Sequence, residues 1–84
     1  MKLSVKGLAL AAALIWGGAI LVVGIANHVC PPYGSEFLAV MGSVYPGYKP
    51  GTGVSSIITG TLYALVDGGV GGAIFAWLYN LFVK

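Results

Sequence analysis

Two long apolar runs limit what this chain can fold into. The first extends over 21 residues from Gly7 to Asn27, and about 20 apolar residues span a bilayer as a helix. The second, from Val54 to Val83, contains one charged residue, Asp67. As one helix, this second run would be about 45 Å long, which exceeds a hydrocarbon core of about 30 Å. It must therefore tilt, protrude or break, and we expect residues 60–81 to lie in the membrane.

The composition favours a membrane protein over a soluble domain. Of the 84 residues, 58% are hydrophobic and 7% are charged, whereas a soluble domain has about 25% charged residues. A chain this short and this apolar cannot bury its own surface in water. We predict one all-α membrane domain over 1–84, a hairpin of two transmembrane helices at 5–27 and 54–83. A net charge of +2 and the lack of arginine argue against a nucleic-acid partner.

The lysines predict the orientation of this hairpin. Lys2 and Lys6 precede the first run and Lys84 follows the second, whereas the connecting segment carries Lys49 and Glu36. By the positive-inside rule, both termini are cytoplasmic and the connection lies outside. The alternative is a signal peptide, because the small residues of 24–26 suit a signal peptidase. The apolar stretch is nevertheless longer than the usual signal-peptide core of about 7–15 residues.

The connection from His28 to Gly53 is rich in turn signals but contains one helical pattern. Three proline pairs, Pro31-Pro32, Pro46-Gly47 and Pro50-Gly51, mark turns. Between them, apolar residues at helical spacing predict a short helix over 35–45, with Ser35 as its N-cap. This helix is too short to span a bilayer, so we expect it to be interfacial or re-entrant. Aromatic residues are expected to form two belts: Tyr33, Tyr45 and Tyr48 outside, Trp77 and Tyr79 inside.

Small residues recur every fourth position along the second run. Such a glycine-zipper pattern lets two helix backbones approach closely, and the opposite side, with Ile58, Leu62, Leu65, Ile74 and Leu81, suits lipid. The first run has a weaker stripe of small residues, through which it could dock against the stripe of the second run. Small residues on other sides of the second run could contact a second partner. We therefore expect self-association or insertion into a larger complex. The stripe comprises Ser56, Gly60, Ala64, Gly68, Gly72 and Ala76, and its counterpart Ala9, Ala13, Gly17 and Gly24.

Asp67 is the one carboxyl inside the candidate spans. A carboxyl group at bilayer depth costs about 2.5–3.5 kcal/mol, so it normally faces protein, water or a partner. We expect it to be protonated, hydrogen-bonded or matched from another subunit, with Tyr63 and the Trp16 indole as candidate donors. Three interpretations stay open: a packing contact, a polar conduit and proton coupling. For proton coupling, the architecture resembles the rotor c-subunit of ATP synthases.

Catalytic and metal chemistry find little support in the sequence. His28 and Cys30 lie two residues apart at the end of the first run, but two ligands do not make a zinc site. Cys30 is the sole cysteine, so it could pair only with another chain. No nucleophile and base, phosphate loop or metal cluster is recognisable. We therefore expect no enzyme activity and no cofactor.

Three segments carry a family resemblance: residues 42–48 (GSVYPGY), 62–69 (LYALVDGG) and 72–80 (GAIFAWLYN). They resemble a group of small bacterial two-span membrane proteins labelled phage-holin-like. This resemblance implies a homo-oligomer in the bacterial cytoplasmic membrane, with membrane leakage on expression. The alternatives are an accessory subunit of a larger respiratory or photosynthetic complex and a proton- or ion-conducting hairpin that uses Asp67.

Overall fold

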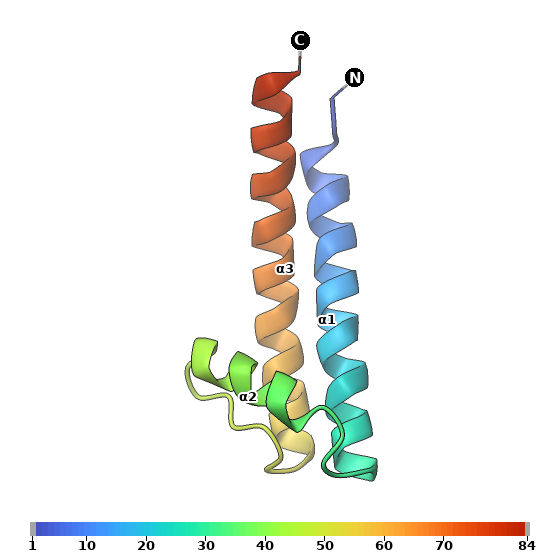
Figure 1. Cartoon of the computed structure of the whole chain (residues 1–84). Coiled ribbons are helices and arrows are strands. Elements are labelled where there is room, and N and C mark those ends of the chain that lie inside the picture. Colours follow the sequence, from blue (N-terminus) through green and yellow to red (C-terminus); the bar gives the residue numbers. More distant parts are fainter. Residues whose placement is uncertain (1, 84) are drawn as a thin grey trace.

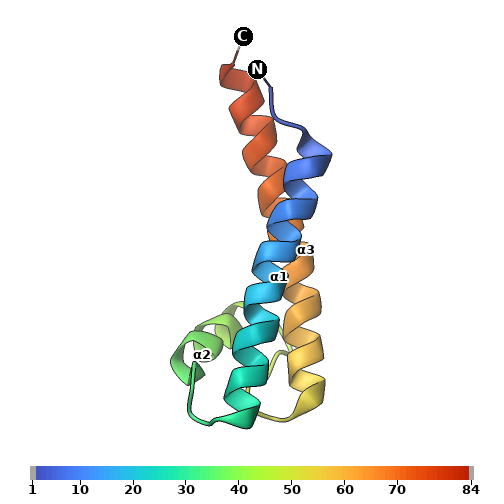
Figure 2. The same ribbon diagram turned by 90° about the vertical axis from the view of Figure 1, so that its right-hand side faces the viewer.

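The chain folds as a helical hairpin with a third helix laid against it. A computed structural model describes residues 2–83, which form α1 (Val5–Val29), α2 (Ser35–Val44) and α3 (Val54–Phe82). The helices α1 and α3 run antiparallel, both chain ends lie at the same end, and α2 crosses the other half (Figures 1 and 2). The prediction of an all-helical hairpin is confirmed for the described residues. Both long helices are long and apolar enough to cross a membrane.

The helix ends lie close to their predicted positions. The α1 helix begins after Ser4, whose Oγ accepts a hydrogen bond from the Gly7 amide at 3.0 Å. It continues to Val29, two residues past the prediction, and α3 ends at Phe82. At 1.5 Å per residue the 25 and 29 residues of these helices correspond to about 38 and 44 Å. Both helices exceed a hydrocarbon core of about 30 Å.

The two long helices touch through small residues. A Cβ atom added at Gly68 would lie 2.7 Å from the Ala12 carbonyl oxygen, and one added at Gly72 would lie 2.7 Å from the Leu8 carbonyl oxygen. Both distances are shorter than real Cβ contacts, so the backbones approach as closely as glycine permits. In the other direction, Gly17 of α1 receives the Leu65 side chain, with its Cδ2 2.4 Å from an added Cβ. Leu65 therefore packs within the hairpin, and its predicted lipid-facing position is wrong.

The small-residue stripe of α3 is occupied within the chain. Gly68 and Gly72 contact α1, whereas the Tyr48 ring covers Gly60, with its Cε1 2.7 Å from an added Cβ. Ala64 and Ala76 are fully buried. The stripe thus joins α3 to α1 and to the connecting segment, and it leaves no continuous small-residue face for a second chain.

The short helix α2 differs from its prediction in three details. Its N-cap is Gly34, with φ 69°, so Ser35 is the first helical residue and not the cap. Its last helical residue is Val44, and Tyr45 forms the C-cap. Tyr45 and Tyr48 are each 4% exposed, so the prediction of an outer aromatic belt is wrong for these two tyrosines. The connecting segment folds back onto the long helices and buries both rings there.

A reciprocal pair of hydrogen bonds closes the end of the hairpin that carries the termini. The Leu3 amide donates to Asn80 Oδ1 at 2.8 Å, and Asn80 Nδ2 donates to the Leu3 carbonyl oxygen at 2.8 Å. One asparagine side chain thereby satisfies both polar groups of a residue ahead of α1. This contact fixes the N-terminal segment against the last turns of α3.

Candidate functional site

Three helices meet at Asp67 through a series of two hydrogen bonds. The Trp16 indole Nε1 of α1 donates to the Tyr45 hydroxyl at 2.8 Å. That hydroxyl, at the end of α2, donates to Oδ2 of Asp67 in α3, also at 2.8 Å. Only the Tyr45 hydroxyl is directed at the carboxyl group, whereas the Trp16 indole is directed at the Tyr45 oxygen. The arrangement therefore holds Asp67 as an acceptor and joins α2 to both long helices.

Aromatic rings hold this donor series in place. The Tyr45 ring stacks on Tyr63, with centroids 5.1 Å apart and planes at 10°, and lies 6.2 Å from the Tyr48 ring. Trp16 meets Phe37 of α2 edge-on at 6.0 Å. The Tyr63 hydroxyl donates to the Pro46 carbonyl oxygen. These contacts fix Trp16 and Tyr45 before any partner binds, so the hydroxyl aimed at Asp67 is preorganised.

The protonation state of Tyr45 suits its role as a donor. Burial raises the pKa of the Tyr45 hydroxyl, and the hydrogen bond to Asp67 and the negative charge of Asp67 raise it further. The Trp16 hydrogen bond acts in the opposite direction. Because the net effect raises a pKa that is already near 10, Tyr45 stays protonated at neutral pH, and its hydroxyl is the hydrogen-bond donor to Oδ2 of Asp67.

One side of Asp67 is open. The residue is exposed although it lies midway along α3, and its Oδ1 accepts no hydrogen bond from the described residues. One turn further, a Cβ added at Gly71 would meet nothing within 4 Å. Beside it lies an open apolar groove of about 410 Å³. It is lined by Leu8, Ala12, Ile15, Trp16, Gly68, Gly71, Gly72 and Phe75.

The structure assigns different contacts to the residues singled out in the sequence. Gly68, and not Asp67, forms the tight contact with α1. Trp16 reaches Asp67 only through Tyr45, and Tyr63 bonds Pro46 instead of the carboxyl group. Sequence reasoning missed Tyr45 as the direct partner. The only sequence feature that marks Tyr45 is its position at the end of a predicted helix, directly before Pro46. Nothing in the neighbouring residues indicates that its side chain reaches a residue 22 positions later.

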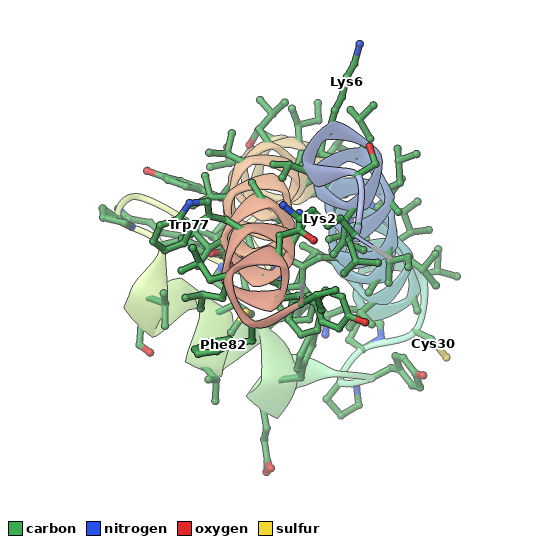
Figure 3. The ribbon with its side chains drawn as sticks, turned by 90° about the horizontal axis from the view of Figure 1, so that it is seen from above. Lys2, Lys6, Cys30, Trp77 and Phe82 are labelled. Carbon is green, nitrogen blue, oxygen red and sulfur yellow. The ribbon has the colours of Figure 1, made fainter. Side chains whose placement is uncertain are left out.

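The remaining sequence candidates lie far from this cluster. Cys30 and His28 are both exposed near the loop end, and Figure 3 shows the Cys30 side chain pointing away from the helices. Within residues 2–83, no group of three or more His, Cys, Asp or Glu side chains could hold a metal ion. The polar cluster at Asp67 is therefore the candidate functional site.

Comparison with known protein families, with curated proteins and with solved structures found no match for this chain.

Proposed function

We propose that this chain is a non-enzymatic membrane protein that docks onto other transmembrane helices through the face carrying Asp67 and Gly71. The observation that carries the proposal is an exposed carboxyl group midway along a candidate span. Facing lipid, such a group costs about 2.5–3.5 kcal/mol. A partner that covers it and donates a hydrogen bond removes most of that cost.

The surface of the hairpin supports a location in the membrane. Large apolar side chains project from both long helices around the hairpin (Figure 3), among them Leu14 at 69% and Ile15 at 74% exposure. A soluble monomer rarely exposes an apolar surface this extensive. We place both termini in the cytoplasm of a bacterium, since Lys2 and Lys6 lie at the end where both chain ends meet.

The chemistry of Asp67 favours a partner of different sequence. No lysine lies at the depth of Asp67, because Lys6 is in the first turn of α1 and the other three lie outside both long helices. A second copy therefore brings no cation to this depth. Trp16 and Tyr45 already use their donors within the chain. A different helix with a lysine, arginine, serine or asparagine at mid-depth would complete the site, and Gly71 leaves room for its backbone. This is the accessory-subunit interpretation.

A second candidate is the holin-like homo-oligomer. The specific support is a second open glycine, because a Cβ added at Gly18 of α1 would also meet nothing within 4 Å. Gly18 and Gly71 lie on different helices, and a closed ring of copies needs two different faces on each chain. This candidate predicts an assembly whose only protein component is this chain, and leakage of the membrane on expression.

Proton conduction has less support from the same contacts. The hydrogen-bond series that ends on Asp67 begins at the Trp16 indole, which is a donor only and cannot pass a proton onward. The series therefore positions the carboxyl group and does not relay protons to it.

A purification from native membranes tests the proposal. A tagged chain is extracted in mild detergent and its complex is weighed by native mass spectrometry, for the wild type and for Asp67→Ala. We expect a complex with a component of different mass that is lost in Asp67→Ala and kept in Glu36→Gln. Glu36 is the other acid, exposed at the start of α2. Copies of this chain alone would favour the homo-oligomer, and a monomer in every sample would refute docking.

A further inference from the structure

A second feature, separate from Asp67, lies at the loop end of the hairpin. A half-enclosed cavity of about 280 Å³ opens between the last turns of α1, the start of α2 and the start of α3. Pockets for drug-sized ligands have volumes of about 300–1,000 Å³, so this cavity, just below that range, fits a small polar group. Its lining mixes polar side chains with Leu38 and Ile57.

Asn27 presents an unused acceptor to this cavity. The residue is only 8% exposed, and its Nδ2 donates to the Tyr33 carbonyl oxygen at 2.7 Å and to Ser35 Oγ at 3.0 Å. These two bonds fix the orientation of the amide. Its Oδ1 accepts no hydrogen bond from the described residues and points toward Gly51, where an added Cβ would lie 4.0 Å away. Asn27 and Gly51 both line the cavity.

Two hydroxyl groups of the lining have hydrogen-bonding capacity left. Tyr48 lines the cavity, and its hydroxyl, whose oxygen lies 3.1 Å from a Cβ built at Gly60, makes no hydrogen bond within residues 2–83 and stays accessible. Ser35 Oγ accepts from Asn27, which leaves its own proton free to donate. The cavity therefore offers one fixed acceptor and two hydroxyl donors.

The start of α3 adds further donors. Its N-cap is Gly53, which has no side chain to satisfy the amides of the first turn. Gly53 and Ser56 line the cavity, and Ser56 Oγ is engaged with the Gly53 carbonyl oxygen. The partial positive charge of a helix N-terminus favours an oxygen ligand, and an anionic one most. His28, at the rim, is a further donor to such a group.

We propose that this cavity binds a glycerol phosphate group. A glycerol hydroxyl donates to Asn27 Oδ1, the remaining oxygens accept from Tyr48 and Ser35, and the phosphate lies toward the start of α3 and His28. The loop end of a two-span hairpin is level with lipid headgroups, so phosphatidylglycerol is the source that fits a membrane location. The choice of a lipid as the source depends on the membrane location proposed above. Binding of a glycerol phosphate group by the cavity does not depend on it.

Lipid retention tests the proposal directly. The full chain is placed in nanodiscs with equal amounts of phosphatidylglycerol and phosphatidylcholine, and the retained lipids are weighed by native mass spectrometry. We expect retention of phosphatidylglycerol over phosphatidylcholine. Because one hydrogen bond contributes about 0.5–1.5 kcal/mol, its loss in Tyr48→Phe should weaken this preference about two- to tenfold. Tyr33→Phe is the matched control, since Tyr33 is exposed and lies outside the cavity lining.

A second variant and a soluble probe make the outcomes distinct. In Asn27→Asp the acceptor oxygen remains but the amide donor that fixes it is lost, so binding should fall while circular dichroism keeps its helical signal. Retained lipid displaced by glycerol 1-phosphate identifies the headgroup as the source. Binding of glycerol 1-phosphate without lipid preference identifies a free ligand. Equal retention of both lipids without binding of glycerol 1-phosphate, or unchanged binding in Tyr48→Phe and Asn27→Asp, would overturn the site. Asp67→Ala should retain the lipid, which separates this test from that of docking.

Discussion

Replacing Gly68 by leucine should separate the two long helices. A Cβ at this position would lie 2.7 Å from the Ala12 carbonyl oxygen, 2.9 Å from Trp16 Cβ and 3.1 Å from Ala13 Cα. Two of these three atoms belong to the α1 backbone, so no change of rotamer relieves the contact. Overpacking of a well-packed contact costs about 1–3 kcal/mol. The displacement also moves Trp16 away from Tyr45 and weakens the donor series to Asp67.

Gly71→Leu is the matched control for this substitution. It makes the same chemical change three residues along the same helix, where an added Cβ meets nothing within 4 Å. Each variant removes a helical glycine, which is about 1 kcal/mol less favourable than alanine within a helix. This gain is common to both, so the difference between the variants isolates the clash with α1. We expect Gly68→Leu to be less stable than Gly71→Leu by about 1–3 kcal/mol.

Unfolding in mixed micelles measures that difference. With Trp77 replaced by phenylalanine, Trp16 is the sole tryptophan, and its fluorescence reports the α1–α3 contact as sodium dodecyl sulfate is titrated in. The midpoint for Gly68→Leu should fall below that for Gly71→Leu. Equal midpoints with unchanged Trp16 emission would show that the contact tolerates a side chain, and the close approach of the backbones would then not be what holds the hairpin together.

Three further predictions concern individual hydrogen bonds. Tyr45→Phe removes the donor to Asp67 and should lower stability by about 0.5–1.5 kcal/mol, with a shift of the Trp16 indole proton resonance in NMR spectra; an unmoved resonance would argue against the series. Asn80→Ala removes both bonds to Leu3 and should speed amide exchange ahead of α1 without affecting the loop end. The pKa of Tyr45 is raised above its unfolded value near 10. The protonated hydroxyl therefore makes its full contribution to the free energy of unfolding below pH 10, and this contribution is lost as pH rises through the folded pKa. Unfolding midpoints measured across this range should therefore fall less steeply in Tyr45→Phe than in the wild type.

Features with a local cause could be predicted from the sequence. The length of the apolar runs and the proline and glycine pairs are enough to place the helices within one or two residues of Val5–Val29, Ser35–Val44 and Val54–Phe82. The prediction of Ser35 as the cap is wrong, because Gly34 takes the N-cap position with a φ of 69°, a backbone conformation that favours glycine, and Ser35 becomes the first helical residue.

The partners of individual residues were decided by tertiary structure. The spacing of Gly60, Gly68 and Gly72 predicts close packing but carries no information on what packs there. The fold divides the stripe between Tyr48 and α1, which removes it as a continuous face for self-association. Likewise, Tyr45 reaches Asp67 only because the connecting segment folds back along the hairpin.

The sequence by itself thus determined that the chain forms an apolar helical hairpin with one carboxyl group midway along its second long helix. Tertiary structure decided that this carboxyl group receives a donor from α2 on one side and stays open on the other. The physical reason is range. Helix formation and hydropathy depend on neighbours a few residues apart, whereas the contacts of Asp67, Asn27 and Tyr48 depend on where a connection of two dozen residues comes to rest.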